Sequence, residues 1–215
     1  MIAGLAAHGL KAVGAFHPGP GDGAPPGTGT LVLVGAAGGR MWRVFSAAPE
    51  AADGAPDPLD RWSRRVIGGI AAGIGARAIF PFDGPPWPPF VRWAARGEGS
   101  RPSPVAIPVS PTRGLWASYR GALALAERLE LDGARPAPPC PACPAPCLTA
   151  CPVDAFAGGR YDVAACTAHV ASPEGVACRS GCLVRRACPA GAGATPPEAQ
   201  RRFHMTAFLA ARRGG

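Results

Sequence analysis

All eight cysteines of this chain lie between Cys140 and Cys188, and none occurs earlier in its 215 residues. The first four have the spacing C-x2-C-x3-C-x3-C-P, which runs from Cys140 to Pro152. A bacterial ferredoxin run is C-x2-C-x2-C-x3-C-P, so this run differs by one residue. In such a run three cysteines bind one [4Fe-4S] cluster, and the fourth binds the neighbouring cluster. The spacing therefore predicts thiolate ligation of iron–sulfur clusters.

The remaining four cysteines are spaced less regularly, as an isolated Cys166 followed by C-x3-C and C-x5-C-P. A C-P-x-x-A pattern follows both Cys151 and Cys188, which indicates an internal duplication. Eight thiols are the number that two [4Fe-4S] clusters require. Crossed ligation predicts that Cys140, Cys143, Cys147 and Cys188 hold one cluster, and that Cys151, Cys166, Cys178 and Cys182 hold the other. Arg179, Arg185 and Arg186 lie among these ligands and would raise the potential of a cluster at which they point.

Three other interpretations of the cysteines remain open. One cluster with spare cysteines would account for the irregular second motif. Structural zinc sites also use C-x2-C pairs, although they seldom need four cysteines so close together. A disulfide scaffold would require an oxidising compartment.

Charge and hydropathy limit the expected partners. The formal charge is +8, and two clusters with four thiolates each would reduce it to about +4. An acidic redox partner suits such a charge, and nucleic acid is not the expected partner. No stretch approaches the ~20 apolar residues of a membrane span, and no export signal is recognisable. We therefore expect a cytoplasmic protein that does not bind a membrane.

The proline-rich stretch Arg135–Pro139 reads as a stiff connector and divides the chain. We expect an α/β domain over 1–134, a cysteine-rich module over 135–194 and a C-terminal docking helix over 195–215. In the first domain, short apolar runs predict strands at 12–16, 30–34, 78–82, 105–109 and 115–125. A helix should begin at Asp57-Pro58, with Leu59, Trp62 and Val66 on its apolar face. A capping box at Thr195–Glu198 should open the final helix.

The cysteine-rich segment, CPACPAPCLTACPVDAF…YDVAACTAHV…GCLVRRACP, resembles the iron–sulfur region of epoxyqueuosine reductases and reductive dehalogenases. In those families a ferredoxin-like module with two clusters accompanies a cobalamin-binding domain, and the resemblance covers about 140–190. Epoxyqueuosine reductases are longer and carry a C-terminal helical-repeat region for tRNA, to which no stretch of these 215 residues is expected to correspond. This difference puts queuosine chemistry in doubt.

The N-terminal part resembles the cobalamin-processing CblC family in the stretches AFHPGPG, TLVLVG, DPLDRW and RGLWASYRGALAL. The resemblance implies a flavin-reductase-like α+β fold that binds a corrinoid. It also implies that Arg120, in the YRG segment, lies at the cofactor site. The usual D-x-H-x-x-G corrinoid motif is absent from the sequence.

Three functions from different classes follow from these observations. The leading one is an oxidoreductase of the corrinoid-reductase kind, in which the clusters pass single electrons to a cobalamin held by the N-terminal domain. The alternative is a simple ferredoxin-like electron carrier whose N-terminal domain docks a redox partner protein and binds no corrinoid. An accessory role in RNA modification, suggested by the positive charge and the epoxyqueuosine relatives, is a third.

Overall fold

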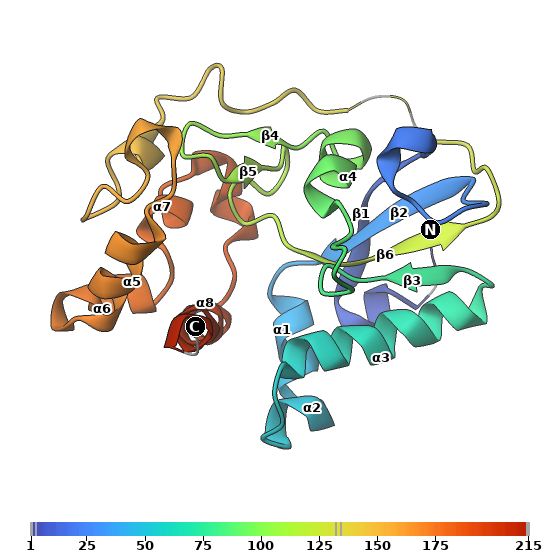
Figure 1. Ribbon diagram of the computed structural model, residues 1–215, viewed down its shortest axis with the longest axis horizontal. Helices are drawn as coiled ribbons and strands as arrows, with labels where there is room; N and C mark the ends of the chain where they lie inside the picture. Colours follow the sequence, from blue (N-terminus) through green and yellow to red (C-terminus); the bar gives the residue numbers. More distant parts are fainter. Residues whose placement is uncertain (1, 3, 132, 134, 214–215) are drawn as a thin grey trace. The chain divides into compact units, whose positions relative to one another are not determined.

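A computed structural model describes residue 2, residues 4–131, residue 133 and residues 135–213 (Figure 1). The chain forms two compact units. Unit 1 comprises Met1–Ser100 and Ser118–Arg135, and unit 2 comprises Arg101–Ala117 and Pro136–Gly215. The expected boundary between residues 134 and 135 falls next to Ala134, which lies outside the described residues. Residues 101–117, which the sequence division left in the N-terminal part, belong to unit 2.

Unit 1 is built on a four-stranded antiparallel sheet in the order β1-β2-β6-β3. Its strands are β1 (Leu10–Phe16), β2 (Thr30–Ala36), β3 (Arg77–Ile79) and β6 (Tyr119–Leu125). The first six residues of β2 are buried, as expected for a central strand that is covered on both faces. The expectation of mixed α and β structure is confirmed in this unit.

Helices cover both faces of this sheet (Figure 1). Leu31 and Leu33 of β2 pack in one core cluster with Trp93 of α4 (Phe90–Gly97). The opposite face meets α3 (Pro58–Gly73), where a Cβ on Gly121 would lie 3.1 Å from Ile67 Cδ1. Alternate residues of a strand point to opposite faces, so the same strands serve both cores.

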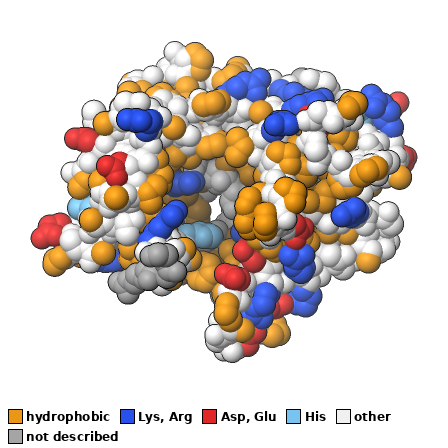
Figure 2. Space-filling view, in the orientation of Figure 1, with side chains coloured by type: hydrophobic (Ala, Val, Ile, Leu, Met, Phe, Trp, Pro, Cys, Tyr) orange, Lys and Arg blue, Asp and Glu red, His pale blue; other side chains and the backbone are white. Residues whose placement is uncertain are grey.

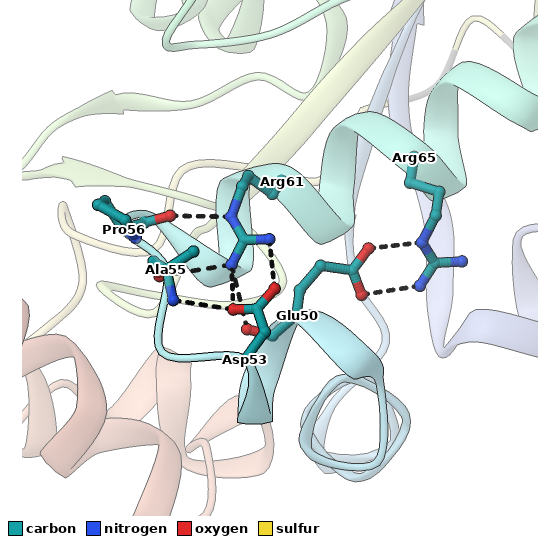
Figure 3. Close-up of polar contacts among 6 residues, drawn as sticks. All are labelled: Glu50, Asp53, Ala55, Pro56, Arg61 and Arg65. Atoms are coloured by element: carbon teal, nitrogen blue, oxygen red, sulfur yellow. Dashed lines mark hydrogen bonds and ion pairs between the residues drawn. The ribbon is translucent and has the colours of Figure 1, made fainter.

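Two short helices, α1 (Gly39–Ser46) and α2 (Pro49–Ala52), precede α3 and were not predicted from the sequence. Paired arginine–carboxylate contacts join α2 and the loop after it to α3 (Figure 3). Arg61 donates to both carboxylate oxygens of Asp53 at 2.7 Å. Arg65 donates to both oxygens of Glu50, at 2.5 Å and 2.9 Å. Such two-pronged contacts fix the direction of both partners.

Unit 2 is composed of short helices and a small hairpin. The hairpin pairs β4 (Arg101–Pro102) with β5 (Pro108–Val109) in antiparallel fashion. The helices are α5 (Val163–Ala171), α6 (Val176–Arg179), α7 (Leu183–Arg186) and α8 (Glu198–Arg213). The cysteine loops also contain single 3-10 turns, at Pro146–Leu148 and Pro189–Ala194.

Several expected element boundaries differ from the structure. The strand expected over 115–125 begins only at Tyr119, and residues 115–117 of that range belong to unit 2. The predicted α3 forms from Pro58, but the Asp57 side chain makes no capping hydrogen bond. The final helix begins at Glu198, and the Thr195 hydroxyl donates to the Gly191 carbonyl at 3.4 Å. In the described part of the chain, no helix combines the length and apolar character that crossing a bilayer requires.

Candidate functional site

Four of the eight thiols form a group that we call the first group: Cys140, Cys143, Cys147 and Cys188. Burial raises the pKa of the Cys140 thiol most, and the other three members of the group raise it further. Burial also raises the pKa of Cys147, with Cys188 and Cys143 adding to the effect. Neighbouring thiols raise each other's pKa because two thiolates close together repel. The structure thus brings Cys188 back to the loop that carries the other three cysteines.

The loop between Cys143 and Cys147 accommodates its additional residue through a left-handed turn. Ala145 has φ 54° and ψ 47° and directly precedes the 3-10 turn that carries Cys147. Its N–H donates to the Cys143 Sγ at 3.4 Å. Non-glycine residues seldom adopt positive φ, so the surrounding structure must maintain this conformation. The left-handed conformation of Ala145 therefore accommodates the additional residue between Cys143 and Cys147.

The other four thiols form the second group: Cys151, Cys166, Cys178 and Cys182. Burial raises the pKa of Cys178 most, and its neighbours Cys182, Cys166 and Cys151 all act in the same direction. The pKa of Cys166 is likewise raised by burial and by Cys182 and Cys151. These cysteines come from a loop, from α5, from α6 and from the residue before α7. The thiols that act on Cys178 and Cys166 are thus the ones that crossed ligation would group with them, while ligation of clusters by the two sets stays a prediction.

Backbone N–H groups point at sulfur atoms in both groups. The Ala155 N–H donates to the Cys151 Sγ at 3.3 Å. A hydrogen bond from the Leu183 N–H lowers the pKa of Cys178, and one from the Leu148 N–H does so for Cys147. Such bonds favour the thiolate form, which is the form that binds metal.

Six of the eight cysteines, three from each group, lie in or against one hydrophobic core. Cys147 and Cys188 are buried in it beside Val105, Val109 and Leu115. Cys140, Cys151, Cys166 and Cys182 pack against the same core. All eight cysteines lie among the described residues, and each is a free thiol there. Residues 101–117 therefore form part of the wall of the cysteine site, which no local pattern in the sequence indicates.

Gly114 is the point at which this wall lies closest to a thiol. A Cβ at Gly114 would lie 2.8 Å from the Cys188 Sγ and 2.4 Å from the Gly191 nitrogen. Gly114 also has φ +53°, a conformation that glycine adopts without steric cost. The Gly-Leu-Trp sequence alone could not reveal this contact, because Cys188 lies far away in the sequence.

The three arginines among the cysteines have different surroundings. Arg179 donates to the carbonyls of Val170 and Ser172 at 2.7 Å and 2.6 Å, at the end of α5. Arg186 is exposed. Arg185 donates from Nη1 to the Leu115 carbonyl at 2.5 Å, and burial lowers the pKa of Arg185 while Cys182 opposes that effect.

Tyr161 was not singled out from the sequence, although it precedes Cys166 by five residues. Its ring stacks on Phe156 with centroids 4.7 Å apart and an interplanar angle of 5°. Desolvation of the hydroxyl end raises the pKa of Tyr161, and a hydrogen bond with Cys166 raises it further. The same hydrogen bond lowers the pKa of Cys166, as expected when the hydroxyl donates to sulfur.

Arg120, the predicted cofactor-binding residue, lies on β6 within unit 1. It donates to the Ser63 hydroxyl at 3.0 Å, the Leu59 carbonyl at 3.2 Å and the Asp60 carboxylate at 2.5 Å. Burial lowers the pKa of Arg120, and Asp60 opposes that effect. These contacts give the arginine a structural role between β6 and α3, while corrinoid binding by it stays a prediction.

Within the described residues, no set of three or more His, Cys, Asp or Glu side chains is arranged to hold a metal ion. A single zinc ion draws four donors to within about 2.0–2.3 Å of one point. A [4Fe-4S] cluster makes a different demand, because each thiolate binds a separate iron. Two sets of four free thiols suit that donor requirement in number and in chemistry.

The chain matches no protein-family model, no curated protein and no solved structure.

Lys and Arg side chains recur over the face drawn in Figure 2, interspersed with hydrophobic ones.

Proposed function

We propose that unit 2 is an electron-transfer module that holds two [4Fe-4S] clusters, one in each group of four thiols. The observation that carries this proposal is that the thiols influence one another within two sets of four, and that six of the eight lie in or against one hydrophobic core. Thiolates are the ligands that such clusters require, and burial limits their access to solvent. When bound, the clusters would supply one-electron chemistry.

The protein's own residues would prepare each site in two ways. The loop at Ala145 and the approach of Gly114 set the positions of the first group. The N–H groups of Ala155 and Leu183 and the Tyr161 hydroxyl are directed at sulfurs of the second group. Hydrogen bonds to sulfur raise the reduction potential of such a site, because they stabilise the more negative reduced state.

Iron and acid-labile sulfide analysis of anaerobically purified protein tests the module. We expect about eight of each per chain. Cys147→Ala should remove the cluster of the first group, and Cys178→Ala that of the second, so each should halve the iron content. A colourless or zinc-containing preparation would overturn the proposal. If Cys178→Ala retained the full iron content of a four-iron protein, the single-cluster alternative would hold instead.

The electron acceptor distinguishes the two forms of the proposal. In the first, unit 1 binds a cobalamin and unit 2 reduces it, as the resemblance to the CblC family implies. In the second, unit 1 docks a redox partner and binds no corrinoid. The engagement of Arg120 by Ser63, Leu59 and Asp60 favours the second form, because that arginine already has protein partners.

Adding cob(II)alamin to the full chain under anaerobic conditions separates these two forms. Corrinoid binding should change the absorption spectrum of the corrinoid and raise the unfolding temperature of the protein. At a corrinoid concentration of a hundred times Kd, the free energy of unfolding should rise by about 2.7 kcal/mol. Unchanged spectra and unfolding temperatures would leave the carrier form. The iron content decides the presence of the clusters independently.

A further inference from the structure

The segment 110–117 of unit 2 lies against the first thiol group. Ser110 and Gly114 exchange two backbone hydrogen bonds, each 3.0 Å long, which close a tight turn. At this turn a Cβ on Gly114 would lie 2.8 Å from the Cys188 Sγ. The next residue, Leu115, is 1% exposed and packs in the core that contains Cys188. The backbone of this segment is therefore fixed beside a thiol of the first group.

Trp116 follows in the same segment, and its ring lies at the turn that begins at Cys188. The Gly191 N–H donates to the Cys188 carbonyl at 3.1 Å and closes that turn. A Cβ on Gly191 would lie 3.0 Å from the Trp116 Cδ1, which is the ring atom bonded to Nε1. The backbone N–H of Trp116 donates to the Arg113 carbonyl at 3.0 Å. The hydrogen-bonding edge of the indole is thus held beside the turn that carries Cys188.

The indole N–H of Trp116 is buried, and no atom of the described residues accepts its hydrogen bond. By contrast, Trp93 of unit 1 donates from Nε1 to the Asp22 carbonyl at 2.7 Å, as buried indoles usually do. Ser103 Oγ and Gln200 Oε1 are also buried without a partner in this part of the chain. A hydroxyl can donate or accept and an amide oxygen only accepts, whereas an indole nitrogen only donates. Trp116 therefore needs an acceptor.

We propose that Trp116 donates a hydrogen bond from Nε1 to a sulfur atom of the first group's cluster. This inference rests on the proposed function. A cluster held by Cys188 would bring sulfide and thiolate acceptors to the turn beside which the indole edge lies. Uptake of one electron from a low-potential donor makes the cluster one unit more negative, and no bond breaks. The hydrogen bond stabilises that additional charge, so it raises the reduction potential of this cluster.

The hydrogen bond can be detected in the unaltered full chain, because Trp116 is the single tryptophan of unit 2. The protein is labelled with nitrogen-15 tryptophan, purified anaerobically and reduced with dithionite. Pulsed electron paramagnetic resonance should then detect a nitrogen-15 coupling to a reduced cluster. Cys178→Ala, which should keep the first group's cluster alone, should retain this coupling, and Cys147→Ala should abolish it. No coupling in protein of full iron content, or the reverse behaviour of the two variants, would overturn the inference.

Trp116→Phe removes the donor and keeps an aromatic ring. The coupling should disappear, and the midpoint of one cluster should fall by at least a tenfold change in the ratio of reduced to oxidised cluster, which is about 59 mV for one electron. The other midpoint should move by less than half as much. Trp93→Phe, which removes an indole that serves Asp22 in unit 1, should leave both midpoints unchanged.

Unchanged midpoints in Trp116→Phe, or equal shifts of both, would overturn the inference. If Trp116→Phe did not fold, the coupling in the labelled, unaltered protein would still decide the matter. In each of these cases the iron content would continue to support the proposed function, whereas absent iron would refute that function first.

Discussion

Gly114 shows how one residue can limit the cysteine site. Any Cβ at this position would overlap the Gly191 backbone and approach the Cys188 Sγ to 2.8 Å, and the positive φ adds a second cost. A left-handed conformation costs a non-glycine residue about 1–2 kcal/mol, and overpacking a further 1–3 kcal/mol. We predict that Gly114→Ala lowers the free energy of unfolding of unit 2 by about 2–4 kcal/mol. Chemical denaturation of the metal-free protein measures this loss.

Gly193→Ala provides the matched control for this substitution. Nothing lies within 4 Å of a Cβ built on Gly193, and its φ is not in the left-handed region. Its effect should stay within about 0.5 kcal/mol. Iron analysis of both variants should show a loss of the first cluster in Gly114→Ala alone. Equal stability of the two variants would contradict the importance of this close approach.

The sequence defined the cysteines themselves and their expected pairing into two sets, because ligand spacing is a local property of the chain. It could not identify Gly114 or Leu115 as part of the site, because their contacts with Cys188 and Arg185 join distant segments. The sequence also could not show that Arg179, Arg185 and Arg186 have different surroundings. Arg179 binds carbonyls at the end of α5, and this depends on where that helix stops.

The junction of β6 and α3 depends on Arg120. Its side chain is 11% exposed, and it makes three hydrogen bonds to α3 residues, including an ion pair with Asp60. Removing one partner of a buried ion pair leaves the other uncompensated, but Asp60 is 36% exposed, which reduces the penalty. We predict that Arg120→Gln destabilises unit 1 by about 2–4 kcal/mol.

Arg64→Gln is the comparison for this prediction. Arg64 pairs with Asp83 and lies over Phe80 and Phe82, but its side chain is 55% exposed. Exposed ion pairs and ring contacts contribute little, so the loss should not exceed about 1 kcal/mol. Urea denaturation of both variants decides the matter. Similar losses would mean that the Arg120 network adds nothing beyond an ordinary surface pair.

The loop before β2 is held by a buried carboxylate. Asp22 is 5% exposed and accepts from the Gly19 N–H at 2.6 Å, and it also pairs with Arg96. The Gly19 hydrogen bond lowers the pKa of Asp22 most, and Arg96 lowers it further. A carboxylate whose pKa is lower in the folded state stabilises the fold above its unfolded pKa of about 3.9, and this contribution is lost as the pH falls through the folded pKa.

We therefore predict that Asp22→Asn reduces the pH dependence of stability below about pH 4, where the unaltered protein loses the contribution of this carboxylate. At pH 7 the variant should be less stable, and the two proteins should converge as the pH falls. Urea denaturation at several pH values between 2 and 7 measures both trends. Parallel curves would show that Asp22 does not contribute through its charge.

Secondary structure was predictable where a local pattern sufficed. The apolar run of β2 and the three- and four-residue spacing in α3 identified both elements. Helices α1 and α2 were missed because their short sequences carry few turns of periodicity. The segments 105–109 and 115–125 were read as strands, but only Pro108–Val109 and Tyr119–Leu125 form β5 and β6. Val105 and Leu115, outside these strands, pack in the core that contains the cysteines. Packing against residues that are distant in the sequence overrides local strand propensity in these segments.

The two units differ in what holds their cores together. The core of unit 2 includes Cys147 and Cys188, whereas the core cluster between the sheet and α4 in unit 1 contains no cysteine. Cluster ligation that stabilises only the folded state of unit 2 adds to the folding free energy of that unit.

We predict that removing iron with a chelator and an oxidant lowers the unfolding temperature of unit 2 and leaves that of unit 1 unchanged. Hydrogen exchange followed by mass spectrometry should then show faster exchange in α5 and α7 and unaltered protection in β2 and β6. Equal loss of protection in β2 would mean that the clusters stabilise both units, and protection unaltered throughout would mean that the thiols fold without them.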